Sequence, residues 1–181
     1  MRYDIVEKLG EGNRGEVFKA KLEDGRVAAI KWAKNYEIDK EWEILNFLNG
    51  LHAPKPIYRG RRYFIMEYVD ALPLKEYVGS KEYYKTLSLA LQAAYDLDKK
   101  GVNHGQLGRF YHIFKREKDV VFIDFERGDI TSNPRNFMQI VGYYLYRDEK
   151  FDKKRIKELV EIYKKTPLKG LEKTIRYINE S

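Results

Sequence analysis

The chain has 181 residues, a formal net charge of +7 and no cysteine, and 43% of its residues are hydrophobic. This composition excludes disulfides and thiolate metal sites, and it is typical of a folded globular protein rather than a disordered one. No apolar run is long enough for a transmembrane helix, and the first residues do not form a signal segment. We therefore expect a cytoplasmic protein without membrane contact.

The first predicted elements are two strands joined by a glycine-rich turn. Residues 3–9 and 16–22 have strand character, and the pattern G-x-G-x-x-G-x-V runs from Gly10 to Val17. In a dinucleotide-binding fingerprint the glycines would lead into a helix, whereas here they lead into a second strand. A glycine hairpin can lie flat over phosphates, because no side chain holds the backbone away. Taken alone, an ordinary β-turn explains the glycines equally well.

The next two predicted elements each contribute one charged residue. A third strand over 26–32 carries Lys31 near its end, and the ammonium of Lys31 would reach phosphates under the hairpin. Taken alone, Lys31 reads as a surface lysine with a half-buried stem. Residues 39–48 predict an amphipathic helix. Glu41 in this helix is the natural partner for Lys31, although a helical glutamate by itself is more often solvated.

A buried strand is predicted over 63–69, and the composition changes over 70–74. This change predicts a hinge between two parts of the chain. At such a hinge, backbone groups of Glu67 and Val69 would bond the edge of an adenine. A core strand that binds no ligand is the alternative interpretation for this run by itself.

Beyond the hinge the predicted elements are mainly helical. Helices are indicated over 80–99, from Asn133-Pro134 onward, over 152–165 and over 169–179, with one hairpin made by 112–114 and 120–123. We expect Ser80 to cap the first of these helices and Pro134 to occupy the first position of the second. The predicted fold class is α+β, with an N-terminal lobe over 1–69 and a shortened, mostly helical C-terminal lobe over 70–181.

In this order the motifs resemble those of the eukaryotic-type protein kinase superfamily, over roughly residues 1–145. The matching positions are the glycine loop, the strand lysine, the helix glutamate, the hinge, a catalytic-loop-like segment and a metal-site-like segment. They are Gly10, Gly12, Gly15 and Val17; Lys31; Glu41; Glu67 to Val69; His104-Gly105-Gln106-Leu107; and Asp124-Phe125-Glu126. The resemblance implies a bilobal protein kinase-like fold whose N-terminal lobe is an antiparallel sheet plus one helix.

The resemblance also implies roles toward ATP and Mg²⁺. Lys31 would bond the α- and β-phosphates and pair with Glu41, and Asp124 would hold Mg²⁺. His104 would help to shape the catalytic loop. For these last two residues, a buried aspartate satisfied by backbone N–H groups and an exposed loop histidine are the alternatives. The positions that would line the nucleotide are Gly10, Gly12, Gly15, Val17, Ala29, Met66, Glu67 and Val69.

Two departures from the family fall in the catalytic loop. Gln106 stands where the family has a catalytic aspartate, and a primary amide can orient a hydroxyl but cannot accept its proton near neutral pH. General-base catalysis is worth ~10²–10⁴-fold, so its loss slows a kinase without necessarily abolishing turnover. Tyr111, followed by His112, stands where the family has a metal-binding asparagine, and neither is a good Mg²⁺ ligand.

The metal-site-like segment departs as well. Glu126 replaces a glycine, which is similar to choline kinases and aminoglycoside phosphotransferases, while His104-Gly105 is similar to small atypical kinases related to the RIO group. Glu126 and Asp129 would serve as a second metal ligand or lie solvated in the loop. Pro134 follows Asp124 by only ten positions, which is too few for a long activation segment that would present a protein substrate.

Three hypotheses for the function follow. The leading one is an ATP- and Mg²⁺-dependent phosphotransferase that acts on a serine or threonine hydroxyl, its own included. The second is a pseudokinase that acts as a nucleotide-responsive binding module, because of Gln106 and Tyr111. The third is a small-molecule kinase with a hydroxyl acceptor, because the activation segment is short.

The positive charge is concentrated in short basic runs. They are Arg59-Gly60-Arg61-Arg62, Lys153-Lys154-Arg155 and Lys164-Lys165. Such runs attract phosphates, including those of nucleic acid. A solvated surface is the better interpretation here, because the sequence contains no nucleic-acid module pattern.

Overall fold

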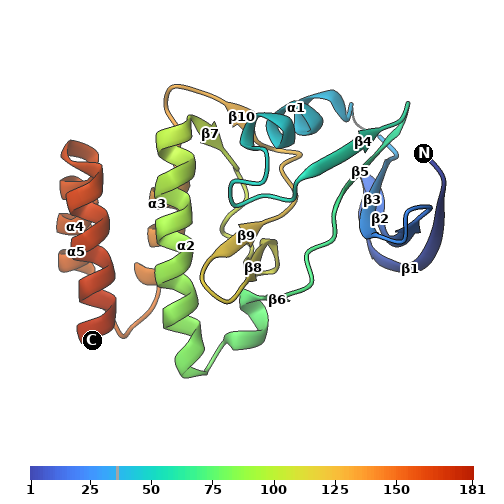
Figure 1. Ribbon diagram of the computed structural model, residues 1–181. Helices are drawn as coiled ribbons and strands as arrows, with labels where there is room; N and C mark the ends of the chain where they lie inside the picture. Colours follow the sequence, from blue (N-terminus) through green and yellow to red (C-terminus); the bar gives the residue numbers. More distant parts are fainter. Residues whose placement is uncertain (36) are drawn as a thin grey trace. The chain divides into compact units, whose positions relative to one another are not determined.

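The computed structural model describes residues 1–35 and 37–181. It divides into two compact units, Met1–Asp70 and Ala71–Ser181, which we call the N-terminal unit and the C-terminal unit. The first is built on a sheet and the second mainly on helices (Figure 1). The predicted α+β class is therefore confirmed.

The N-terminal unit consists of an antiparallel sheet and one helix, α1 (Asp39–Leu48). The sheet has five strands in the order β1-β2-β3-β5-β4. Their bounds are β1 Tyr3–Glu11, β2 Gly15–Leu22, β3 Val27–Ala33, β4 Pro56–Arg59 and β5 Tyr63–Glu67. The glycine turn joins β1 to β2, and β5 ends at Glu67, so that Tyr68 and Val69 lie in the connection that follows.

The strand register places different sets of side chains on the two faces of this sheet. Val17 lies opposite Lys31, and Ala29 lies opposite Met66. Directly opposed residues share a face, and so do residues two apart on one strand, so these four side chains lie on one face. The other face carries an apolar cluster that comprises Ala20, Leu22, Ala28, Ile30 and Ile65. The candidate nucleotide residues are thus separated from this cluster.

The C-terminal unit is arranged around its longest helix, α2 (Lys81–Lys100). This helix packs against α3 (Asn136–Ile140), α5 (Pro167–Glu180) and strand β9 (Val120–Phe122) (Figure 1). The other elements are β6 Leu72–Pro73, a 3₁₀ turn Leu74–Tyr77, β7 Val102–Asn103, a 3₁₀ turn Phe110–His112, β8 Ile113–Lys115, β10 Asp129–Ile130, a π-helix Val141–Leu145 and α4 Lys153–Lys165. No helix in the described ranges is both long and apolar enough to cross a membrane.

Helix α2 has the predicted amphipathic pattern. It buries residues at helical spacing, among them Leu87, Leu91, Ala94 and Leu97. The helix ends at Gly101, whose φ of 86° is a left-handed conformation that glycine adopts without strain. The loop that follows is therefore fixed in direction at its first residue.

Two predicted helix starts differ from the structure. Ser80 stands at the N-cap position of α2, but its hydroxyl donates to the carbonyl of Tyr77 and does not cap the helix. Helix α3 begins at Asn136, two positions after Pro134. The N–H of Asn136 donates to the carboxylate of Asp98 at 2.9 Å. The start of α3 is thus set by a contact with α2, which local sequence cannot show.

Candidate functional site

The N-terminal unit contains a buried ion pair between Lys31 on β3 and Glu41 on α1. The Lys31 ammonium lies 3.0 Å from each carboxylate oxygen, and the two side chains are only 6% and 2% exposed. The predicted pairing is therefore present. A buried ion pair is weak evidence for stability, because desolvation offsets much of the attraction. This pair therefore calls for an explanation beyond stability of the unit.

The glycines of the first turn differ in what the fold requires of them. A Cβ atom on Gly15 would lie 2.3 Å from the carbonyl oxygen of Trp32, so the pairing of β2 with β3 demands glycine there. A Cβ atom on Gly10 or Gly12 would meet nothing within 4 Å among the described atoms. These two glycines leave the backbone of the turn uncovered, which close approach of a phosphate requires.

An acidic residue next to this turn is neutralised by two lysines. Glu11 forms ion pairs with Lys34 and with Lys8. Hydrogen bonds from Lys34 and then from Lys8 lower the pKa of Glu11 to about 2. A phosphate beside the turn would therefore meet a carboxylate whose charge is already balanced.

The connection after β5 contains an available backbone donor. The N–H of Glu67 donates to the carbonyl of Lys55 at 2.8 Å, so it is already used. The N–H of Val69 donates to no other residue of the described chain. Val69 is half-buried. Its N–H is thus available in the segment where the sequence predicts contact with an adenine.

In the C-terminal unit, His104 links the predicted catalytic loop, residues 104–107, to the strand that precedes Asp124. Its Nε2 lies 2.7 Å from the carbonyl oxygen of Ile123, and its Nδ1 accepts from the N–H of Gln106 at 3.1 Å. A carbonyl only accepts, so Nε2 carries the proton and the ring is neutral. The ring is fully buried and packs against Phe125. His104 therefore holds the loop against the strand, and neither nitrogen is left for proton transfer to a substrate.

Helix α3 and the π-helix also hold the loop. The side chain of Gln139 accepts from the N–H of Leu107 at 2.6 Å and donates to the carbonyl of Gly105 at 3.3 Å. The hydroxyl of Tyr144 donates to the carbonyl of Leu107 at 2.6 Å. Gly105 has a φ of 88°, and a Cβ atom there would lie 2.9 Å from a neighbouring carbonyl oxygen. The glycine after His104 is thus required by the loop's own shape.

A chain of buried and half-buried polar side chains connects the loop to more distant helices. Asn136 accepts from the N–H of His104 at 2.8 Å, and its amide donates to Asp98 at 2.9 Å. The hydroxyl of Tyr163 on α4 donates to the other oxygen of Asp98 at 2.6 Å. Burial raises the pKa of Asp98, and burial together with the bond to Asp98 raises that of Tyr163. Helices α2, α3 and α4 therefore all anchor the backbone of the catalytic loop.

Gln106 provides an acceptor atom with no partner in the described chain. Its side-chain Oε1 is buried and receives no hydrogen bond from the residues that the structure describes. A buried acceptor left without a donor costs ~1–3 kcal/mol. In the sequence prediction, Gln106 takes the position of the family's catalytic aspartate.

Asp124 follows strand β9 in a conformation that is uncommon for a residue with a side chain. Its φ is 65°, and non-glycine residues in this left-handed region gather at functional sites. Its Oδ2 lies 3.4 Å from Nε2 of His112, and Nδ1 of His112 faces the carbonyl of Gln106 at 3.3 Å. Sequence reasoning sets His112 aside as a poor ligand. The position of His112 directly after Tyr111 was the only feature of the sequence that could have indicated a role for it. The sequence pattern does not show that the chain brings His112 close to Asp124.

The remaining metal-ligand candidates do not form a three-ligand site with Asp124 in the described ranges. Tyr111 is 44% exposed, and its hydroxyl accepts from Arg109 at 2.8 Å. Within residues 1–35 and 37–181, no three His, Asp or Glu side chains come together as a metal site. Glu126 and Asp129 therefore do not complete a three-ligand set with Asp124. A single carboxylate still suits Mg²⁺, which is commonly held by one or two carboxylates with substrate phosphates and water.

Comparison with known proteins identifies relatives. The family model described as RIO domain matches residues 23–148. RIO-type serine/threonine-protein kinase Rio2 of Methanocaldococcus jannaschii is 27% identical over 196 residues, which cover 83% of this chain and 71% of that protein. Serine/threonine-protein kinase rio2 of Schizosaccharomyces pombe is 24% identical over 132 residues, which cover 68% of this chain and 38% of that protein.

A shorter similarity is to calmodulin-binding receptor-like cytoplasmic kinase 1 of Arabidopsis thaliana. It is 41% identical over 51 residues, but these cover only 28% of this chain and 11% of that protein. The RIO domain match, in contrast, covers more than half of the chain. Among the families that the motifs resemble, the RIO-like one is therefore confirmed. The chain belongs to the RIO domain family and has a small kinase-like α+β fold.

Proposed function

We propose that this RIO domain protein is an ATP- and Mg²⁺-dependent phosphotransferase that acts on serine or threonine hydroxyls of a protein. The observation that carries the proposal is the buried Lys31–Glu41 pair, on the sheet face that also holds Val17, Ala29 and Met66. That face offers an ammonium for phosphates beside small and apolar side chains for a base. The two Rio2 relatives are serine/threonine-protein kinases, which supports the same activity.

Both units carry residues with proposed roles toward the nucleotide. Lys31 would bond the α- and β-phosphates, the uncovered backbone at Gly10 and Gly12 would lie over them, and the N–H of Val69 would bond the adenine. Asp124 would hold Mg²⁺ through its carboxylate. The bound ion would neutralise negative charge on the phosphates, which is a main requirement of phosphoryl transfer.

The catalytic loop indicates slow transfer. The amide of Gln106 would orient the substrate hydroxyl through a hydrogen bond. An amide does not take up the proton, so the general-base contribution of ~10²–10⁴-fold is missing. Positioning and charge neutralisation remain, and phosphoryl transfer depends mostly on these.

A pseudokinase that binds nucleotide without turnover is the second candidate function. It is favoured by Gln106, which cannot act as a base, and by Tyr111, whose exposed side chain replaces a metal-binding asparagine. The two candidates share nucleotide binding and differ in transfer of the γ-phosphate. They are therefore separated by measurements on the same protein.

The test is a nucleotide titration with and without Mg²⁺, on native protein, Lys31→Ala and Lys40→Ala. Lys40 is an exposed residue of α1 next to Glu41, so Lys40→Ala is the matched control. We expect Mg²⁺ to tighten ATP binding, Lys31→Ala to weaken it at least about tenfold through loss of one charge-assisted contact, and Lys40→Ala to leave it unchanged. Lys31→Arg keeps the charge beside Glu41 in case Lys31→Ala unfolds.

Transfer is then measured with γ-labelled ATP and a mixture of protein acceptors. Label on serine or threonine supports the phosphotransferase, and tight binding without label supports the pseudokinase. Folded native protein that binds no nucleotide with or without Mg²⁺ would overturn both.

A further inference from the structure

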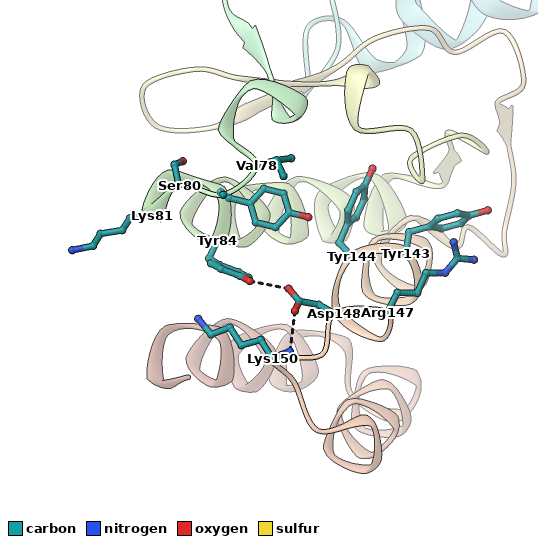
Figure 2. A pocket seen from close by; sticks show the side chains of 11 residues that line it. Val78, Ser80, Lys81, Tyr84, Tyr143, Tyr144, Arg147, Asp148 and Lys150 are labelled. Atoms are coloured by element: carbon teal, nitrogen blue, oxygen red, sulfur yellow. Dashed lines mark hydrogen bonds between the residues drawn. The ribbon is translucent and has the colours of Figure 1, made fainter.

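The C-terminal unit contains an open pocket of about 670 Å³ whose residues have no role in the site described above. It lies between the start of α2 and the end of the π-helix (Figure 2). Its walls carry several tyrosines together with Lys81, Arg147, Asp148 and Lys150. A π-helix is rare and is often found at functional sites. This one supplies two of the tyrosines in the pocket wall, Tyr143 and Tyr144.

The balance of charge in the pocket is positive. Asp148 is its acidic member among the lining residues, against three basic ones. The Asp148 carboxylate accepts from the hydroxyl of Tyr84 at 2.8 Å and from the N–H of Lys150 at 2.9 Å (Figure 2). Burial and this bond raise the pKa of Tyr84 to about 12, so the tyrosine stays a neutral donor. The Asp148 carboxylate is thus hydrogen-bonded to other groups of the protein. Arg147 and Lys150 line the pocket as cations that a ligand could meet.

Two of the cations are held in place by aromatic rings. The Lys150 ammonium lies 4.1 Å from the centre of the Tyr84 ring, and the Arg147 guanidinium lies 4.4 Å from the centre of the Tyr143 ring. Ordering these long side chains in advance lowers the entropy cost of binding an anion. The same contacts cover one face of each ring. Base stacking, on which single-stranded nucleic acid depends, is therefore hindered at both tyrosines.

The pocket wall touches the catalytic loop directly. The hydroxyl of Tyr144 donates to the carbonyl of Leu107 at 2.6 Å. A Cβ atom on Gly108 would lie 2.7 Å from the ring of Tyr143, so the ring packs closely on the loop there. Leu107 and Gly108 are the two residues that follow Gln106. A ligand in this pocket is therefore within a few residues of extended chain, at about 3.3 Å each, from the proposed acceptor-orienting group.

We propose that this pocket binds an acidic segment of a protein substrate, whose carboxylates pair with Arg147 and Lys150 and whose serine or threonine hydroxyl reaches Gln106. The part of this inference in which the hydroxyl reaches Gln106 rests on the proposed phosphotransferase function. The binding half depends on the pocket alone. It gives the acceptor a chemical class, and it supplies an alternative to the long activation segment that the chain lacks.

The test uses fluorescence anisotropy with a labelled peptide that contains one serine and several aspartates and glutamates, without nucleotide. We expect binding that weakens with salt, and an affinity loss of about tenfold in Arg147→Glu and in Lys150→Glu, as attraction becomes repulsion. Lys169→Glu, an exposed position on α5, makes the same charge change outside the pocket and should bind as the native protein does. Arg147→Gln and Lys150→Gln are milder variants in case a charge reversal unfolds.

Equal affinity of the native protein for a peptide with amides in place of the acids overturns the proposal. So does binding of single-stranded RNA in place of the acidic peptide with the same dependence on Arg147. The peptide-binding measurement contains no nucleotide, so it can be interpreted even if the protein does not bind ATP. Conversely, a protein that transfers phosphate equally well to acidic and neutral serine peptides retains the proposed function and loses the proposed pocket.

Discussion

Lys31 and Gln106 can be compared, because each lies in a frame of hydrogen bonds and each would face a reactant. In the N-terminal unit the frame is β3 with α1, and the reactive group is an ammonium paired with Glu41. In the C-terminal unit the frame is complete as well, with His104 and Asn136 bonded on the loop backbone. There, however, the group at the reactive position is an amide. The comparison teaches that an ordered frame of hydrogen bonds does not determine the chemistry of the side chain that it holds.

The largest effect should come from restoring a carboxylate at the reactive position of the loop. Gln106→Asp provides a base, and we expect the transfer rate to rise by ~10²-fold or more if the frame still holds the loop. Gln106→Asn has the same length as the aspartate and no base, so it should give no increase. Labelled-phosphate transfer at saturating ATP measures both. Equal rates in the two variants would mean that more than the base has been lost.

The next largest effect concerns the metal carboxylate. Asp124→Asn should lower transfer by ~10²–10³-fold, the range for removal of one group that stabilises developing charge. It should also abolish the gain in ATP affinity that Mg²⁺ gives to the native protein. Asparagine tolerates the left-handed backbone at this position, so the fold should persist. Asp4→Asn, on the exposed strand β1, is the control, and a Mg²⁺ response that survives in Asp124→Asn would contradict the assignment.

A smaller effect separates fold from binding within the glycine turn. Gly15→Ala should destabilise the protein by about 1–3 kcal/mol, because its Cβ would overlap a backbone oxygen. Gly12→Ala has open space, so its melting temperature should equal that of the native protein while its ATP affinity falls. Thermal melts and nucleotide titrations on both variants check this. A stability loss in Gly12→Ala would show that the turn is packed within the protein.

The smallest predicted effect tests the frame of the loop. Tyr163→Phe removes the hydroxyl that bonds Asp98 and should lower the free energy of unfolding by about 0.5–1.5 kcal/mol. Burial raises the pKa of Asp98, so the folded state keeps this proton to higher pH than the unfolded state, and stability falls as pH rises through the range above 3.8.

The hydroxyl opposes that shift, because it favours the charged form of Asp98. The cost of Tyr163→Phe should therefore shrink as the pH is lowered through the same range. Denaturant melts of the native and variant proteins at several pH values measure the difference. A cost that does not change with pH would show that the hydroxyl does not act through Asp98.

The elements of the N-terminal unit could be predicted, because each one is indicated by a pattern within a short stretch of the sequence. Strand alternation, the glycine spacing and a helical glutamate are sufficient to predict the sheet and the Lys31–Glu41 pair. A Cβ atom on Gly10 or Gly12 would meet no described atom within 4 Å. For these two glycines the sequence offers two explanations, an ordinary turn or a bound ligand. The structure adds the distinction from Gly15, which depends on how closely β3 passes.

The catalytic loop could be predicted only in part. His104 and Asp124 are recognisable from the motifs around them, but Asn136 and Gln139 contact the loop from 32 positions further along the chain. No local spacing predicts that an amide side chain will meet a backbone group so far away in sequence. The π-helix could not be predicted from the sequence either, because its apolar residues have the spacing of an ordinary α-helix.

The bond between Tyr163 and Asp98 has a practical consequence for where this protein can be cut. The RIO domain match ends at residue 148, before α4 begins. A fragment trimmed to that boundary would retain every motif residue and yet lose the hydroxyl that steadies the acid behind His104. If a fragment that ends at residue 148 were inactive, the cause could therefore be the truncation rather than the catalytic residues.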